Sequence, residues 1–244
     1  MIKLGHLIAI GFAAFVTFSA TLLPASSLLN FVNLPAGLAY GGVEGSLWRM
    51  QLTNVAFRGR PIGNVYLNPN VGTLFGAFSA SARIEGAALN ASFDFGGGEG
   101  LAIRNFEATA QLRGRLASQA YNGAVRLTDV EAVFDRRSLC LSASGELRSN
   151  AFEDMFAALG MSRDAVRAPL ACQDGFLTVD FSRAFAGGIL EANAKLQHAE
   201  GVMLTVLLRF DDQAAIPEQM IGWLETNGFG ATAEGWKTTS RLTL

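Results

Sequence analysis

One short pattern that occurs three times constrains the fold of this chain more than any other feature of the sequence. Each copy has an apolar residue, any residue, an Asn or Asp and a second apolar residue, closely followed by Ala; the copies span residues 52–56, 103–108 and 127–132. Alternating apolar side chains occupy even positions up to Leu52 and odd positions from Val55 onward. A one-residue slip of this kind is what a β-bulge does to a strand. The pattern therefore predicts one type of long, bulged strand that is used several times.

The rest of the chain also predicts a mostly β protein with a largely antiparallel sheet. Apolar and polar residues alternate, as in strands with one wet face, through residues 89–95, 139–147, 190–196 and 202–210. The last two runs flank a short turn and predict a hairpin. Residues 239–244 predict a closing strand.

Two short helices are expected to interrupt the sheet. The first follows Asn150, which forms a variant capping box with Glu153, and it ends at Gly160. The second has Pro217 in its first turn and ends at Asn227 and the glycine after it.

Residues 4–23 predict a transmembrane helix. The segment has no Asp, Glu, Lys or Arg, and a helix of that length spans roughly 30 Å, the thickness of a bilayer core. Lys3 precedes it, so the positive-inside tendency predicts a cytoplasmic tail at residues 1–3 and a periplasmic β-rich domain at residues 24–244. The alternative is a cleaved secretory signal, but the apolar region of such a signal usually has about 7–15 residues. The length favours a retained anchor, and both interpretations export the remainder.

The charge of the chain excludes some classes of partner. The net charge is −2, and charged residues make up 16% of the chain, against roughly 25% in an average soluble domain. This balance argues against a nucleic acid or an anionic lipid that would be held by bulk charge.

The two cysteines, Cys140 and Cys172, both follow the predicted anchor. Two exported cysteines are most simply one disulfide, because the periplasm is oxidising. A metal site is a poor alternative, since two Cys and one exported His, His198, do not supply four ligands at usual zinc spacings.

No motif in the sequence predicts catalysis or a cofactor. His198 falls in the turn of the predicted hairpin, and no Gly-x-Ser-x-Gly elbow is present. The glycine-rich stretch at residues 96–100 lacks the Lys-Ser/Thr of a phosphate-binding loop and is interpreted as a flexible loop between strands. The sequence therefore predicts a protein that is not an enzyme and has no catalytic residue, metal or cofactor.

Several stretches, in order along the chain, resemble the type II secretion system protein N family. That family has a Gly-x-x-Gly-Ser/Thr-Leu/Val-Trp motif just after a membrane anchor, and the matching residues here are Gly42, Val43, Gly45, Leu47 and Trp48. The likeness continues through residues 67–69 and 74–76, through both cysteines and through Trp223 to the end. The chain departs from the family in one place. The family usually has a Trp near the Pro-containing turn, whereas here only Tyr66 is aromatic.

The resemblance implies an accessory inner-membrane subunit of the machine that moves folded proteins from the periplasm across the outer membrane. Such a subunit is a single-pass protein whose bulk is periplasmic, and it acts through contacts with other inner-membrane and periplasmic secretion subunits. The bulged sheet also resembles the grooved β domains of AsmA-type proteins. The alternative is therefore an AsmA-like module that binds lipid or lipidated cargo in the periplasm.

Overall fold

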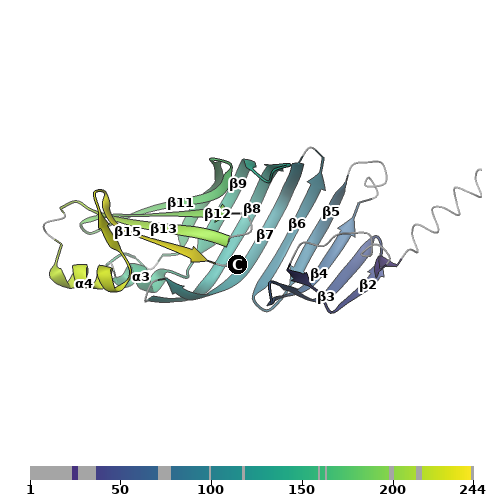
Figure 1. The fold of residues 1–244 in the computed structure, drawn as a ribbon, viewed down its shortest axis with the longest axis horizontal. Helices are drawn as coiled ribbons and strands as arrows, with labels where there is room; N and C mark the ends of the chain where they lie inside the picture. Colours follow the sequence, from purple (N-terminus) through teal and green to yellow (C-terminus); the bar gives the residue numbers. More distant parts are fainter. Residues whose placement is uncertain are drawn as a thin grey trace, which may run out of the picture. The chain divides into compact units, whose positions relative to one another are not determined.

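A computed structural model gives the fold of the chain (Figure 1). It describes residues 24–26, 37–70, 78–98, 100–116, 119–158, 160–162, 164–197, 201–212 and 216–242. The predicted tail and anchor, residues 1–23, lie outside the described residues. Among the described residues, no helix is long and apolar enough to cross a membrane. The chain divides into two compact units, Met1–Gly98 and Glu99–Leu244.

The described part of the first unit is an antiparallel sheet. Its strands are β1 (Leu38–Ala39), β2 (Gly42–Ser46), β3 (Arg49–Phe57), β4 (Arg60–Pro69), β5 (Ser79–Glu85) and β6 (Leu89–Gly97). Strands β3 to β6 follow one another, while β1 and β2 pair with different parts of β3, on its side away from β4. A small core of Met50, Leu52 and Val55 packs with Ala25.

The second unit continues with the long strands that the repeated pattern predicts. Its strands are β7 (Gly100–Leu116), β8 (Gln119–Asp135), β9 (Cys140–Ser149), β10 (Val166–Gln173), β11 (Phe176–Phe185), β12 (Gly188–Gln197), β13 (Gly201–Phe210), β14 (Gly230–Thr232) and β15 (Gly235–Leu242). They are antiparallel neighbours in chain order, except that β15 lies between β13 and β14. The predicted hairpin is confirmed as β12 and β13, with Leu196 opposite Val202.

Strand β10 changes its partner halfway along. Its first four residues, from Val166, pair with β9, and its last four, from Leu170, pair with β11. The ladder between β9 and β10 therefore ends at Glu146, before it reaches Cys140, the first residue of β9.

All three predicted bulges are confirmed, and each centres on the Asn or Asp of the pattern. Asn54, Asn105 and Asp129 have φ angles of 52°, 50° and 51°, and the strand register shifts beside each of them. Asn and Asp adopt this left-handed conformation more readily than other residues with a Cβ. Opposite two of the bulges the partner strand has a glycine with positive φ, Gly63 or Gly145.

Both predicted helices are present, as α3 (Glu153–Ala158) and α4 (Glu218–Thr226). Pro217 is the N-cap of α4 and Asn227 its C-cap. The main core packs residues of both helical regions against β12 and β13, and its members include Phe156, Leu190, Leu208, Leu224 and Phe229. Fully burying a side chain such as that of Leu224, which is 0% exposed, contributes roughly 1.5–3 kcal/mol.

Two local predictions were wrong, and a third had the wrong starting residue. The side chain of Asn150 does not cap α3, because its Oδ1 accepts a hydrogen bond from the backbone N–H of Ala124 at 2.7 Å. The glycine-rich stretch is mostly strand: Gly97 ends β6 and Gly100 begins β7. The predicted closing strand is present as β15, but it begins earlier than predicted, at Gly235, and it pairs with β13 along residues 236–242.

Candidate interaction surfaces

The family-like motif forms the hairpin of β2 and β3. Gly42, Val43 and Gly45 lie on β2, and Leu47 and Trp48 form the two-residue turn that follows it. Gly45 has a φ of +91°, and a Cβ added there would collide with the carbonyl oxygen of Arg49 on the facing strand. The motif therefore has a local structural reason, since only glycine fits this close approach of two backbones.

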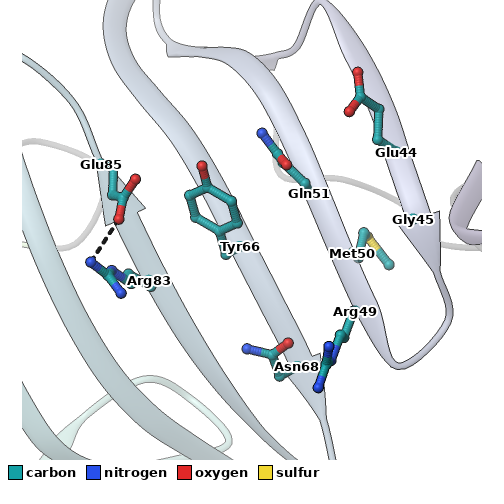
Figure 2. Close-up of a pocket in the computed structure, with 9 residues that line it drawn as sticks. All are labelled: Glu44, Gly45, Arg49, Met50, Gln51, Tyr66, Asn68, Arg83 and Glu85. Atoms are coloured by element: carbon teal, nitrogen blue, oxygen red, sulfur yellow. Dashed lines mark ion pairs between the residues drawn. The ribbon is translucent and has the colours of Figure 1, made fainter.

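An open hollow of about 610 Å³ lies over strands β2 to β5 (Figure 2). The residues that line it are mostly polar: Glu44, Gly45, Arg49, Met50, Gln51, Tyr66, Asn68, Arg83 and Glu85.

The centre of the hollow is one row of side chains that runs across the strands. Gln51 lies directly opposite Glu44 on one side and Tyr66 on the other, and Tyr66 lies opposite Arg83. The phenol ring of Tyr66 stands between Gln51 and Arg83 in Figure 2. Residues directly opposite on adjacent strands share a face of the sheet, so the row presents an amide, a phenol and charged groups together.

Most of these polar groups are not used within the protein. Arg83 forms an ion pair with Glu85 at 2.8 Å. Within the described part of the chain, Gln51, Tyr66 and Asn68 have no side-chain hydrogen bond. Among the described residues, Glu44 and Arg49 also form no ion pair. Their donors and acceptors therefore face solvent and are available to a partner.

Two stretches that carry the family resemblance meet at this hollow. Gly45 belongs to the motif hairpin, and Asn68 belongs to residues 67–69 on the neighbouring strand β4. Tyr66 lies on β4 two residues before Asn68, opposite Gln51 on β3. The sequence marked these stretches but missed Glu44, Gln51 and Arg83 as members of one site. The alternation of Gln51 with buried Met50 and Leu52 was the available signal for an exposed polar face.

A second surface lies in the other unit, beside the disulfide. Cys140 and Cys172 are joined as predicted, with their Cα atoms 5.5 Å apart. The bond ties the start of β9 to the end of β10, beyond the point where the ladder between these strands has ended. The backbone N–H of Cys140 also donates a hydrogen bond to the carbonyl of Gly175 at 2.8 Å. This end of the sheet is therefore fixed by a covalent bond and a hydrogen bond.

Apolar side chains are exposed at this fixed end. Leu101, Val133, Leu139 and Leu141, here called the apolar end, are 42%, 39%, 38% and 63% exposed. Leu101 at the start of β7 lies opposite Phe134 on β8, and Phe134 lies opposite Cys140 on β9. Leu101 lies on the face of Phe134, whereas Val133, the residue before Phe134, lies on the opposite face. Exposed large apolar residues therefore occur on both faces at this end of the sheet, where each is available for contact.

The described residues hold no group of three or more His, Cys, Asp or Glu side chains that could bind a metal ion. His198 lies outside the described residues.

The fold and these surfaces define an antiparallel β protein with two exposed candidate contact sites. The sequence of residues 36–239 matches the family model of type II secretion system protein N. The chain belongs to this family, and the resemblance noted in the sequence is confirmed. The family is an accessory family of the secretion system and is not known as enzymatic. Membership of this family suggests association with the cell envelope. No curated protein and no solved structure matched the chain.

Proposed function

We propose that this protein is a non-catalytic accessory subunit that works by contact with other type II secretion subunits in and beside the inner membrane. Residues 1–3 are cytoplasmic, residues 4–23 form a retained single-pass anchor, and residues 24–244 are periplasmic. The anchor keeps the β domain near the bilayer, where tethering raises its effective concentration toward other membrane subunits.

The observation that carries this proposal is the hollow of the first unit. Two stretches by which the chain resembles its family, from different strands, line one concave surface. The row of Gln51, Tyr66 and Arg83 offers donors, acceptors and an aromatic ring in one place. Tyr and Arg are enriched where proteins contact each other, because each combines a large contact area with polar groups. The family motif therefore has two roles: Gly45 permits the hairpin, and the hairpin forms one wall of the contact site.

The experiment is a pull-down of the full-length, tagged chain from detergent-solubilised membranes. Other type II secretion subunits should be recovered with the parent chain. A Gln51→Ala/Tyr66→Ala variant should recover several-fold less, because truncation of an interface anchor typically costs about 2 kcal/mol or more. The matched control is Thr205→Ala/Thr239→Ala. It removes two polar side chains from neighbouring strands of the other unit, that of Thr205, which is half-buried, and that of Thr239, which is exposed. Equal recovery by the two variants would mean that the hollow is not the contact site.

A second candidate function is the AsmA-like one, the binding of lipid or lipidated cargo, and the apolar end favours it. Leu101 and Leu141 expose apolar surface that an acyl chain could cover. In that case the purified periplasmic part should carry phospholipid in stoichiometric amount, and Leu101→Ser/Leu141→Ser should release it. Recovery of secretion subunits without bound lipid would favour the first function.

A further inference from the structure

Three arginine side chains form one row across adjacent strands of the second unit. Arg126 on β8 lies directly opposite Arg148 on β9, and Arg148 lies directly opposite Arg167 on β10. All three residues are exposed. Adjacent strands are about 4.8 Å apart, so roughly 10 Å separates the backbones of Arg126 and Arg167. We call these three residues the arginine row.

The arginine row is only partly neutralised by the protein. Glu146, two residues before Arg148 on β9, forms a two-pronged ion pair with it, with N–O distances of 2.8 and 3.1 Å. Within the described chain, Arg126 and Arg167 form neither an ion pair nor a side-chain hydrogen bond. Two guanidinium groups, one on each side of a fixed Arg–Glu pair, therefore keep their donors for another molecule.

Fold stability does not explain this row. Like charges directly opposite one another on antiparallel strands destabilise the sheet, and here two such pairs follow in succession. The residues next in sequence, such as Ala168, which is 1% exposed, supply the packing on the other face. A local arrangement that opposes stability is expected at functional sites rather than elsewhere.

The chemistry of the row fits oxyanions on a surface. A guanidinium presents a planar fork of donors that matches phosphate geometry. The three groups stand side by side on an exposed sheet face, which fits a ligand surface that carries several anionic groups. The family places the chain in the cell envelope, where phospholipid head groups form such a surface. We propose that the arginine row binds the phosphate groups of anionic phospholipids at a membrane surface.

This inference goes beyond the contact with secretion subunits, because it concerns another unit of the chain and another partner. It also differs from the second candidate function, because the arginine row binds head-group phosphates, whereas the apolar end would cover acyl chains. The whole chain has a net charge of −2, so bulk attraction to an anionic surface is absent and the local row must supply it. Binding should therefore weaken strongly with salt and should depend on these particular side chains.

The test uses the full-length chain reconstituted into vesicles that contain phosphatidylglycerol. Thr109, the residue opposite Arg126 on β7, is replaced by the photo-crosslinking residue p-benzoylphenylalanine, and lipid adducts are measured by mass spectrometry. An Arg126→Gln/Arg167→Gln variant should lower the adduct yield by about tenfold or more, given the typical contribution of each basic residue near an anionic surface.

The matched control is Arg136→Gln/Arg137→Gln, which removes the same charge from the turn between β8 and β9. It should keep the adduct yield within about twofold of the parent chain, because its charges lie outside the row. An equal yield in both variants, or no lipid adduct at all, would overturn the proposal. The proposal would also be overturned if millimolar inorganic phosphate abolished the adducts while chloride of equal ionic strength did not. The row would then be a site for free oxyanions.

A stability measurement separates binding from a structural role. The substitutions relieve the repulsion with Arg148 but also remove the attraction between Arg167 and Glu146. The urea midpoint of Arg126→Gln/Arg167→Gln should therefore stay close to that of the parent chain. A midpoint clearly below that of the Arg136→Gln/Arg137→Gln control would assign the row to folding and contradict the proposal.

Discussion

At the scale of single residues, Gly45 and Gly59 provide a matched pair for the motif hairpin. Both have positive φ angles, +91° and +79°, but a Cβ on Gly45 would collide with the Arg49 carbonyl, whereas one on Gly59 would meet nothing within 4 Å. Gly59→Ala should cost about 1 kcal/mol of unfolding free energy from backbone strain alone. Gly45→Ala should cost about 3 kcal/mol or more, because the collision adds to that strain. Urea unfolding of both variants measures the difference, and equal losses would contradict this account of the motif.

Glu146 allows a second prediction at this scale. Its hydrogen bond with Arg148, supported by the charges of Arg148 and Arg167, holds the pKa of its carboxyl below the ordinary value. A carboxyl whose pKa is lowered in the folded state contributes stability above its unfolded pKa, and this contribution is lost as pH falls through the folded pKa. Carbon-13 NMR titration of the carboxyl should show a return toward the ordinary pKa in Arg148→Gln. The same pKa in both proteins would mean that the ion pair is not formed in solution.

At the scale of elements, the disulfide compensates for the place where β10 leaves β9. The bridge closes a loop over a sequence separation of 32 residues, which corresponds to about 3–4 kcal/mol in the chain-entropy model. Cys140→Ala/Cys172→Ala should therefore lower the unfolding free energy by about this amount. A reducing agent should destabilise the parent chain and leave the variant unchanged. If reduction leaves the parent chain unchanged as well, the bridge is absent from the protein in solution.

The bulged strands could be predicted from sequence, whereas the surfaces built from them could not. A left-handed residue leaves a mark in the sequence, because Asn and Asp tolerate it, as at Asn54 and Asp129. The hollow depends on Tyr66 lying opposite Arg83, and the arginine row depends on Arg126 lying opposite Arg148. Such registers join residues about twenty positions apart, and alternation gives the face of each side chain without naming its partner.

Competition between elements explains a local failure of prediction. Asn150 has the right residue type and position for a helix cap. The neighbouring strand instead brings the N–H of Ala124 within 2.7 Å of its side-chain oxygen, and that bond to another strand replaces the cap. Spacing along one segment could not reveal a partner 26 residues earlier in the chain.

At the scale of the whole molecule, the proposed topology predicts where each end of the chain lies. Alkaline phosphatase fused after Leu244 should be active, because that enzyme folds only on the periplasmic side. The mature protein should also retain residues 4–23, since their length matches a membrane span better than a signal. A mature protein whose sequence begins near Leu28 would contradict the retained anchor, and an inactive fusion would contradict export.

Contact with other secretion subunits through the hollow of the first unit can be tested directly. Replacing Tyr66 with p-benzoylphenylalanine in living cells places a photo-crosslinker at the centre of that hollow, and Asp180 on β11 is the control position. Adducts with other type II secretion subunits are expected from position 66, and few or none from position 180. Adducts with phospholipid alone at position 66, or equal protein adducts at both positions, would contradict this contact.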